Sequence, residues 1–404
     1  MGLRRLPPVR SPLPGAALAA GVRAALAGGT ARPELRFPEL RDRLLEIFST
    51  RSLLFVDSGT SALALAMGAG SSPKSKLVAI PAYACFDIAT AVDAAGVDFI
   101  PYDIDPGTLG PSWPSLRHAL ESGADAVVVV HLYGIPVDMH AVRTLLAEFS
   151  AACIEDSAQG AGAWFDGRRL GSFGSLSVLS FGRGKGITGG SGGALLANDD
   201  KGVELLEEMR SSVRDRANSA LPEFVKLLAQ YLLARPSVYG IPASLPFLGL
   251  GETPYHKPHQ PHWASSLALG VLSRTIETID AEAQLRRSNA QRVVSAVMSK
   301  ESVVTPPSLA TPGFLRLPLV LRSGNSRLRS DGEAGYCGVM PGYPTALVDL
   351  PGFGERANAA AGAAAVRQFE GARRLASELV TLPVHGGLTE RDLARVEAWL
   401  ATLG

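Results

Sequence analysis

Residues 176–197 read LSVLSFGRGKGITGGSGGALLA, two short apolar runs joined by a glycine loop that carries a single lysine, Lys185. Apolar runs of about four to eight residues bounded by glycine predict buried β-strands. The small residues around Lys185 leave its amine room to enter a pocket, and a desolvated lysine amine can act as a nucleophile near neutral pH. An isolated lysine is more often a solvated surface group, so the chemistry depends on what surrounds this stretch.

The same alternation of apolar runs and helix-like segments extends over residues 50 to 200. We expect seven strands, at Leu53–Ser58, Leu77–Pro81, Asp98–Asp103, Ala126–Leu132, Ala152–Asp156, Leu176–Phe181 and Gly193–Ala197. Helices are expected between them at about 60–69, 86–95, 112–122 and 138–149. Strands that alternate with helices form βαβ units, so the sequence predicts an α/β fold with a seven-stranded, mostly parallel sheet between helices.

Beyond residue 200 the pattern turns helical, over 201–234 and 264–300, and the residues after about 300 indicate a smaller α+β domain. That domain is expected to contain a strand at Phe314–Leu321, a helix at about 365–379 and a final helix capped by Thr389. We therefore predict an N-terminal arm and helix at 1–34 and a large α/β domain at 35–285 with an irregular insertion near 200–262. A small C-terminal domain follows at 286–404.

The composition bounds the class of protein. The 404 residues include 39 Lys and Arg against 38 Asp and Glu, for a net charge of +1. A nucleic-acid or anionic-membrane binder would concentrate basic residues, so neither is expected. The cysteines, Cys85, Cys153 and Cys337, form no C-x-x-C pair and no disulfide framework, which fits a reducing cytosol. We expect a cytoplasmic protein.

Two apolar segments invite a membrane interpretation. Arg4 and Arg5 before an Ala/Leu stretch superficially resemble a signal peptide, but prolines delay the apolar run and Arg23 interrupts it. We expect an amphipathic helix over about residues 15–27 that packs on the body of the protein. The patch at 227–251 contains Arg235 and three prolines, a poor fit to the roughly 20 uninterrupted apolar residues of a membrane span. A helix followed by a buried or interfacial loop is expected there, with an oligomer contact as the alternative.

The segment DSGTSA at 57–62 places small polar residues between a strand and a helix. A helix N-terminus offers unpaired backbone N–H groups to a phosphate, and the hydroxyls of Thr60 and Ser61 would add donors. Helix capping alone also explains this pattern.

The segment CIEDSAQ at 153–159 ends an apolar strand in two carboxylates, at the sheet edge where α/β proteins place ligands. Asp156 could ion-pair there with a cationic ring nitrogen, the partner that the pyridinium of pyridoxal phosphate (PLP) requires as an electron sink. A helix cap or a surface acid is the alternative. The rival phosphate loop, G-x-x-x-x-G-K-[S/T], is disfavoured because Gly186 follows Lys185 where a hydroxyl should bind magnesium.

Two more strand ends carry candidate residues. In PAYACF at 81–86, Tyr83, Cys85 and Phe86 could cover one face of a flat cofactor, with core packing as the alternative for the aromatic residues. In HLYGIPVDM at 131–139, His131 is expected to be a hydrogen-bonded structural group, because the turn chemistry already accounts for the segment.

The order of these segments resembles the DegT/DnrJ/StrS family of fold-type I PLP enzymes, which are mostly sugar-nucleotide aminotransferases. The resemblance lies in SGTSALALA at 58–66, PAYACFDIATAVDAAG at 81–96, VVHLYGIPVDM at 129–139, IEDSAQGAGAWFDGRRLGSFG at 154–174 and SFGRGKGITGGSGGALLAND at 180–199. A looser match, LPVHGGLTERDLARV at 382–396, extends it to the C-terminal domain.

The resemblance implies a role for each matched position. Lys185 would hold PLP as a Schiff base and shuttle protons, Asp156 would pair with the pyridinium nitrogen, and Gln159 would lie against the ring. Thr60, Ser61 and Ser180 would bind the phosphate. The ring-stacking position, commonly aromatic in the family, falls on Cys85, so either its sulfur packs on the ring or Tyr83 or Phe86 covers the ring from the side. A homodimer with active sites at the interface is also implied.

One segment departs from the family. Where the family presents a Gly-x-Asn-Tyr-Arg stretch to the partner's cofactor phosphate, this chain has HKPHQPHW at 256–263. We do not expect a metal site at His256, His259 and His262, because the interleaved prolines preclude a helix face and no carboxylate or cysteine is adjacent. The loop is expected at a dimer interface beside the active site, supplying donors to phosphate or substrate.

The sequence therefore favours a PLP-dependent aminotransferase that moves an amino group from an amino acid, with glutamate expected, to a keto-sugar nucleotide or a related carbonyl compound. Other PLP chemistry remains an alternative: lyase or desulfurase chemistry using Cys85, or a dehydratase, although the family's dehydratases replace the lysine by histidine. A PLP-bound sensor without turnover is the alternative outside enzymology.

Overall fold

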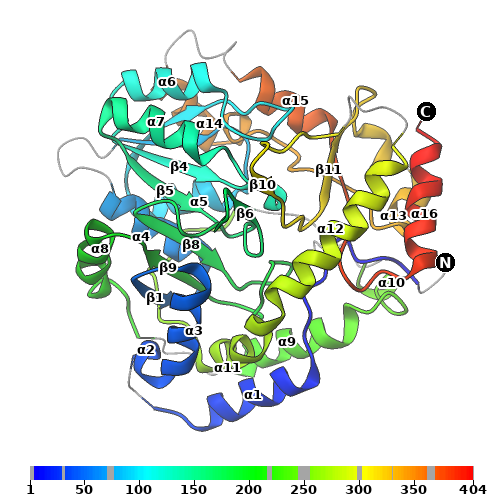
Figure 1. The fold of residues 1–404 in the computed structure, drawn as a ribbon, viewed down its shortest axis with the longest axis horizontal. Helices are drawn as coiled ribbons and strands as arrows, with labels where there is room; N and C mark the ends of the chain where they lie inside the picture. Colours follow the sequence, from blue (N-terminus) through cyan, green and yellow to red (C-terminus); the bar gives the residue numbers. More distant parts are fainter. Residues whose placement is uncertain are drawn as a thin grey trace.

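The computed structural model describes residues 4–29, 32–70, 77–215, 221–243, 255–297, 303–329, 331–361 and 369–403. Its centre is a seven-stranded sheet in the order β1-β9-β8-β5-β4-β2-β3 (Figure 1). The strands are β1 (Ser52–Val56), β2 (Leu77–Pro81), β3 (Asp98–Tyr102), β4 (Ala126–Val130), β5 (Ala152–Asp156), β8 (Leu176–Ser180) and β9 (Gly193–Ala197). Only β9 runs antiparallel to its neighbours in this sheet. The predicted α/β fold with a mostly parallel sheet is confirmed.

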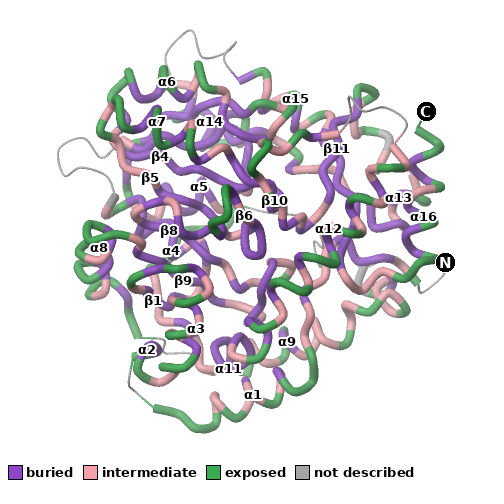
Figure 2. The backbone as a smooth tube through the Cα atoms, viewed as in Figure 1, coloured by how far each residue is buried: buried purple, intermediate pink, exposed green. Residues whose placement is uncertain are grey.

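Helices cover both faces of this sheet, which is why a central strand such as β4 is apolar along its whole length. Every residue of β4, AVVVV, is buried (Figure 2). Right-handed crossovers place α4 (Gly59–Gly70) and α5 (Asp87–Ala95) on one face and α6 (Trp113–Glu121) and α7 (Met139–Phe149) on the other. The helix α8 (Asp200–Arg210) packs against β1 and β9.

The N-terminal helices pack beneath the sheet. The helix α1 (Gly15–Leu26) lies against α11 (Ser266–Thr275) as expected, and a Cβ on Gly21 would stand only 2.8 Å from the carbonyl oxygen of Leu267. The close approach of α1 and α11 therefore depends on small residues. Two further helices, α2 (Pro33–Arg36) and α3 (Pro38–Phe48), lead into β1.

The helical region after residue 200 is more broken than the sequence pattern predicts. It contains α9 (Leu221–Leu233) and α10 (Gly240–Ala243), while residues 244–251 of the apolar patch lie outside the described ranges. The predicted long helix at 264–300 is two helices, α11 and α12 (Ile279–Ser295), joined by a 3₁₀ turn at Ile276–Thr278; residues 298–300 are not described. Among the helices that are described, none has the length and apolar character needed to cross a bilayer.

The C-terminal part is built on a three-stranded antiparallel sheet in the order β11-β13-β12, from Leu317–Val320, Leu379–Leu382 and Met340–Pro341. Around it lie α13 (Gly332–Tyr336), α15 (Glu370–Glu378) and α16 (Glu390–Ala401), whereas α14 (Phe353–Ala361) packs against β3 of the large sheet. The predicted cap is confirmed: Thr389 and Asp392 form a capping box at the start of α16. Residues 365–368 of the predicted helix at 365–379 are not described. The domain boundary at 285–286 would fall inside α12 and stays a prediction.

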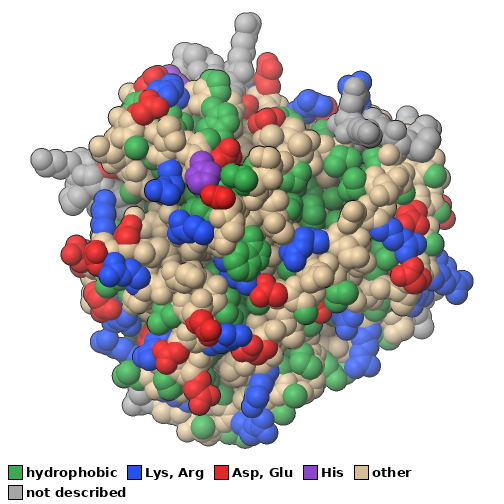
Figure 3. Space-filling view, viewed as in Figure 1, with side chains coloured by type: hydrophobic (Ala, Val, Ile, Leu, Met, Phe, Trp, Pro, Cys, Tyr) green, Lys and Arg blue, Asp and Glu red, His purple; other side chains and the backbone are tan. Residues whose placement is uncertain are grey.

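A second small sheet, β10-β6-β7, pairs Ala310–Thr311 with Trp164–Phe165 and Arg168–Arg169. It joins the chain after β5 to the segment that enters the C-terminal part. On the face shown in Figure 3, basic and acidic side chains are interspersed, in keeping with the near-zero net charge.

The N-terminal strap, residues 4–11, runs along the C-terminal part before reaching the lysine loop. Arg4 forms an ion pair of 2.5 Å with Asp392, and the backbone N–H of Leu6 donates to the carbonyl of Tyr336 at 3.0 Å. At its other end, the hydroxyl of Ser11 donates to the carbonyl of Lys185 at 2.8 Å. The strap thus connects the C-terminal part to the loop that carries the candidate catalytic lysine.

Candidate active site

The start of α4 forms one end of a pocket at the carboxyl edge of the sheet. The pocket is lined by Gly59, Thr60, Leu63, Ala84, Cys85, Asp87, Ile88, Val130, Asp156, Ala158, Gln159, Ser180 and Lys185. The helix begins at Gly59 because Ser58 caps it: the backbone N–H of Ser61 donates to the Ser58 hydroxyl at 3.0 Å. The strand ends therefore bring nearly all the predicted site residues together.

Ser180 lies directly against the first residue of α4. A Cβ on Gly59 would be 2.8 Å from the Cβ of Ser180, so glycine is what allows this approach. The hydroxyls of Thr60 and Ser180 thereby border one helix N-terminus. Ser61 is different: it is buried, contacts Ser58 and His259, and does not line the pocket.

Asp156 ends β5 and is almost fully buried. One of its carboxylate oxygens accepts from the backbone N–H of Ala158 at 2.9 Å. Burial raises the pKa of Asp156, while the Ala158 N–H and the charge of Lys185 act in the opposite direction. A carboxylate in this position is stabilised by a cationic partner inside the pocket.

Gln159 borders the same pocket and is fixed at both ends of its amide. Its Oε1 accepts from the backbone N–H of Tyr133 at 3.1 Å, and its Nε2 donates to the hydroxyl of Tyr343 at 3.0 Å. Tyr343 comes from the C-terminal part of the chain. The structure thus adds a residue that no sequence motif indicated.

Lys185 lies in the glycine loop between β8 and β9, and it is half-buried at the pocket wall. The loop is closed by the backbone N–H of Gly189, which donates to the carbonyl of Phe181 at 2.8 Å. A Cβ on Gly186 would approach the carbonyl oxygen of Ala161 to 2.5 Å, so only glycine fits beside the lysine. The glycines of this loop serve close packing as well as access.

Cys85 lines the pocket wall, whereas Tyr83 and Phe86 are buried in the core and do not line it. Tyr83 instead accepts a hydrogen bond of 2.9 Å from the backbone N–H of Tyr343. The alternative in which Tyr83 or Phe86 covers a cofactor ring is therefore not supported. Burial raises the pKa of the Cys85 thiol to about 12, and its Sγ donates to Asp87 at 3.3 Å.

Behind the pocket, His131 is a structural group, as expected. Its Nδ1 accepts from the backbone N–H of Val137 at 3.1 Å, and its Nε2 lies 3.1 Å from Oε1 of Glu155. Burial by itself raises the pKa of Glu155, but hydrogen bonds from His131 and from the N–H groups of Gly171 and Phe173 lower it to about 2. This buried carboxylate holds the segment after β5 in place.

Arg316 is a second residue that no motif indicated. It precedes β11, and Nη1 donates to the hydroxyl of Thr381 at 3.3 Å. Burial lowers its pKa, although the phenols of Tyr133, Tyr343 and Tyr239 act to raise it. Within the described part of the chain no carboxylate forms an ion pair with Arg316, which leaves a positive charge beside the tyrosines that flank Gln159.

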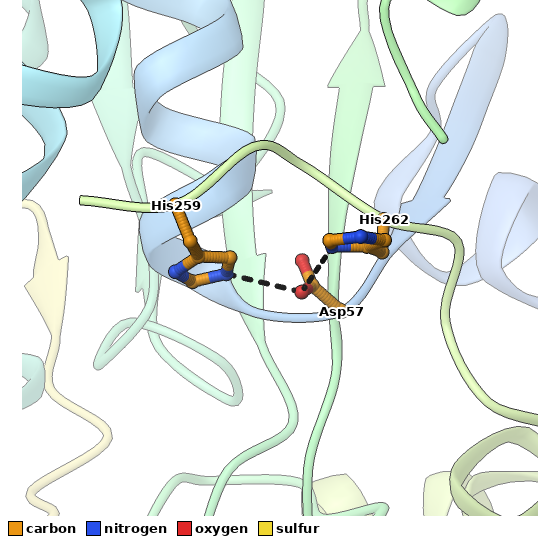
Figure 4. A group of neighbouring side chains, drawn as sticks. All are labelled: Asp57, His259 and His262. Carbon is orange, nitrogen blue, oxygen red and sulfur yellow. Dashed lines mark hydrogen bonds and ion pairs between the residues drawn. The ribbon is translucent and has the colours of Figure 1, made fainter. Parts of the chain in front are cut away.

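The loop at 255–263 reaches the start of α4, as Figure 4 shows. Nε2 of His259 lies 3.1 Å from Oδ2 of Asp57 and 3.5 Å from the hydroxyl of Ser61, and Nδ1 of His262 lies 3.7 Å from the same carboxylate oxygen. The premise that no carboxylate adjoins these histidines was wrong, because Asp57 is brought to them by the fold. The predicted position of the loop beside the candidate site agrees with the structure.

Known proteins resemble this chain in sequence and in fold. The sequence profile of the DegT/DnrJ/EryC1/StrS aminotransferase family matches residues 16–224, just over half of the chain. The L-glutamine:2-deoxy-scyllo-inosose aminotransferase of Streptomyces kanamyceticus is 32% identical over 167 residues, which are 41% of this chain and 39% of that protein. The dTDP-3-amino-3,4,6-trideoxy-alpha-D-glucose transaminase of Streptomyces venezuelae is 35% identical over 160 residues, 39% of this chain and 41% of that protein. The alignments thus span about two fifths of these relatives.

Solved structures show the same fold along the whole chain. The sugar aminotransferase CalS13 from Micromonospora echinospora superposes with a TM-score of 0.74 at 21% identity, covering 98% of this chain and 99% of that one. AtS13 from Actinomadura melliaura gives a TM-score of 0.77 at 22% identity, with 99% of both chains covered.

Proposed function

The chain belongs to the DegT/DnrJ/EryC1/StrS aminotransferase family, and on that premise we propose that it is a PLP-dependent aminotransferase. Its reaction moves an amino group from an amino acid to the ketone of a sugar or sugar-like ring. The observation that carries the proposal is the convergence on one pocket of five side chains from three separate segments: Thr60 from α4, Asp156 and Gln159 from the end of β5, and Ser180 and Lys185 from the end of β8.

The residues present fit the cofactor. The buried carboxylate of Asp156 has one oxygen bonded to a backbone N–H, which leaves the other for a protonated ring nitrogen. The start of α4 presents a helix N-terminus with the hydroxyls of Thr60 and Ser180, a suitable phosphate site, and the Cβ-free Gly59 lets Ser180 approach it. Lys185 lines the same pocket.

When bound, PLP supplies an electron sink for the pair left on the substrate Cα. The protein's own groups do the rest. The amine of Lys185 would remove the proton from Cα of the donor and deliver it to the carbon that carries the cofactor's aldehyde, C4′. Asp156 holds the proton on the ring nitrogen, because a carboxylate in a buried site stabilises a cation there. The amide of Gln159, held by Tyr133 and Tyr343, fixes the lateral position of the ring.

We assign the carboxylate of the amino donor to Arg316. Its guanidinium is a half-buried positive charge with the phenols of Tyr133 and Tyr343 for neighbours, and a carboxylate is the partner that such a group recognises through paired hydrogen bonds. Glutamate is the proposed donor. Glutamine is a second candidate, because it has the same α-carboxylate as glutamate and because relatives such as the Streptomyces kanamyceticus enzyme are named L-glutamine:2-deoxy-scyllo-inosose aminotransferase.

The proposed acceptor is a keto-sugar nucleotide or a related cyclic ketone. The named substrates of the relatives include both a nucleotide-linked sugar and a carbocyclic ketone. The nucleotide-linked sugar is charged and the carbocyclic ketone is not, so an assay with ketones of both classes would show which class the enzyme accepts.

The remaining proposals concern assembly and location. A homodimer is supported by exposed apolar side chains along α9, where Leu221, Val225 and Leu232 are about half exposed or more. The free thiols of Cys85, Cys153 and Cys337 support a reducing cytosol. The arm, large domain and small domain at 1–34, 35–285 and 286–404 are proposed as the units of the fold.

Borohydride reduction of the PLP-loaded protein, followed by peptide mass spectrometry, tests the role of Lys185. We expect the label on Lys185 in the wild-type protein and in the matched variant Lys201→Ala, and no label at this site in Lys185→Ala. A label on another lysine of the wild-type protein would contradict the assignment.

The reaction itself is tested by the half-reaction with L-glutamate or L-glutamine, followed through the change in cofactor absorbance. Conversion to the pyridoxamine form is expected with at least one donor. A protein that binds PLP but is converted by no amino acid would be a sensor. Release of sulfide or alanine would indicate desulfurase chemistry, which the raised pKa of Cys85 disfavours because the nucleophile is the thiolate.

A further inference from the structure

Asp57, His259 and His262 form a compact group beside α4, outside the pocket proposed for the cofactor. Asp57 follows β1, whereas the two histidines lie on the loop at 255–263, some two hundred residues later in the chain (Figure 4). One ligand atom from each side chain lies within 4.8 Å of the other two. We call this group the His–Asp cluster.

The backbone fixes the His–Asp cluster without help from the side chains. The N–H of Asp57 donates to the carbonyl of His262 at 2.9 Å, and the N–H of Gly192 donates to the carbonyl of Asp57 at 3.1 Å. The loop is held further by the N–H of Trp263, which donates to the carbonyl of Arg214 at 3.1 Å. These bonds therefore fix the backbone of Asp57 and that of His262 next to each other.

The charge of Asp57 calls for a cation. Its side chain is 14% exposed, its Oδ1 is buried without a hydrogen bond, and across the described residues its ion pairs are with His259 and His262 alone. The rings of His259 and His262 lie with their centroids 6.3 Å apart, and each presents a nitrogen to the same carboxylate oxygen. A cation held between these three groups would balance the carboxylate charge.

We propose that Asp57, His259 and His262 bind a divalent transition-metal ion, with Zn²⁺ the best match. Imidazole nitrogen and carboxylate oxygen are ligands that zinc accepts. Bonds of about 2.0–2.1 Å in a tetrahedral shell put neighbouring ligand atoms about 3.4 Å apart. Oδ2 of Asp57 lies 3.1 and 3.7 Å from the two imidazole nitrogens, and all three ligand atoms lie within 4.8 Å of one another. His259 and His262 are 51% and 33% exposed, which leaves the fourth position to water.

The ion would act as a clasp between the β1–α4 junction and the loop. Nε2 of His259, a ligand atom, also lies 3.5 Å from the hydroxyl of Ser61 in the first turn of α4. Metal binding would therefore tie the loop to the helix start. The inference does not depend on the proposed reaction, because zinc retention and thermal stabilisation are measured without substrate.

Equilibrium dialysis of the PLP-loaded protein against micromolar zinc, with the bound metal measured by mass spectrometry, tests the cluster. About one zinc ion per chain is expected, together with a rise in Tm on adding zinc. His259→Ala and His262→Ala should each weaken binding by roughly 10²-fold or more, because each removes a direct ligand. Both histidines are partly exposed, so neither variant is expected to unfold.

Two matched variants control for incidental binding. His256→Ala alters the same loop at a residue outside the cluster, and His140→Ala removes a surface histidine that pairs with Asp166 at 2.8 Å without a second histidine. Both should bind zinc as the wild-type protein does. Absence of zinc from the dialysed wild-type protein, or equal zinc in the His259→Ala, His262→Ala double variant, would show that the cluster is only an ion pair.

Discussion

Replacing Gly59 by alanine would place a Cβ 2.8 Å from the Cβ of Ser180 and 3.2 Å from its hydroxyl oxygen. Carbon atoms in favourable contact lie about 3.5–4.0 Å apart, so one of the two residues must move by about 0.7 Å or more. Gly59 opens α4, and Ser180 ends β8. The substitution therefore disturbs the proposed phosphate site without removing any polar group.

The cost of such overpacking is about 1–3 kcal/mol, and each 1.4 kcal/mol or so changes an equilibrium constant tenfold. Rotation of the Ser180 side chain moves its hydroxyl but not its Cβ, so the backbone of Gly59 or Ser180 is displaced, and phosphate binding must restore the wild-type positions of the helix start and the hydroxyl. The strain therefore appears in binding, and we expect the Kd of PLP to rise by about 5- to 150-fold. Pyridoxal, which lacks the phosphate, should lose much less affinity. Fluorescence titration of both compounds measures the difference.

Gly68→Ala is the matched control on the same helix. Gly68 is exposed and a Cβ there meets nothing within 4 Å, so PLP affinity should not change while stability rises by up to about 1 kcal/mol. Wild-type PLP affinity in Gly59→Ala would refute the reasoning, and so would an equal loss for PLP and pyridoxal. Thermal unfolding of the cofactor-free variants shows whether either change acts through stability instead.

The other predictions concern charge and burial. Asp156→Asn should slow the half-reaction with glutamate by about 10²-fold or more, since it removes the charge that stabilises the ring cation; stopped-flow absorbance measures this, and an unchanged rate would remove Asp156 from the mechanism. Burial raises the pKa of Cys85 to about 12, so at pH 8 iodoacetamide should alkylate this thiol about 10³-fold more slowly than a free cysteine, and rapid labelling of the native protein would contradict it. Burial lowers the pKa of His385 to about 4, below its unfolded value. The unfolded chain then binds more protons between those two values, so stability is lost as pH falls from about 6.5 to 4, by about 3 kcal/mol at most. Urea unfolding across this range should show that loss in the wild-type protein and not in His385→Asn.

The sheet could be predicted because each strand is a short apolar run bounded by glycine or polar residues. The predicted strands at Leu77–Pro81, Ala152–Asp156 and Gly193–Ala197 match the structure at both ends. The prediction of one long helix at 264–300 was wrong. The helical spacing of apolar residues continues through Ile276–Thr278, but the structure has a 3₁₀ turn there that separates α11 from α12.

The pocket could be predicted where its residues follow strands of one parallel sheet, since those ends share one edge. Lys185 and Asp156 are such residues. Tyr343 and Arg316 could not be found this way, because they belong to the C-terminal part and reach the site through tertiary packing alone. Neither lies in a motif that indicates its neighbours.

The direction of a side chain just past the end of a strand also could not be predicted from the sequence. Period-two alternation stops there, so nothing in PAYACF shows that Cys85 faces the pocket while Tyr83 enters the core. The His–Asp cluster was missed for a related reason. Ligand spacing was sought among residues adjacent in sequence, and Asp57 comes from the far end of the domain.

The N-terminal strap sets an order on biosynthesis. Residues 4–11 leave the ribosome before every segment that holds them, including Lys185, Tyr336 and Asp392. The sheet can form while translation continues, but the strap has no complete binding surface until α16 has emerged. The first of these segments to be made is thus among the last to be placed, and the lysine loop stays without one of its supports until α16 has been synthesised.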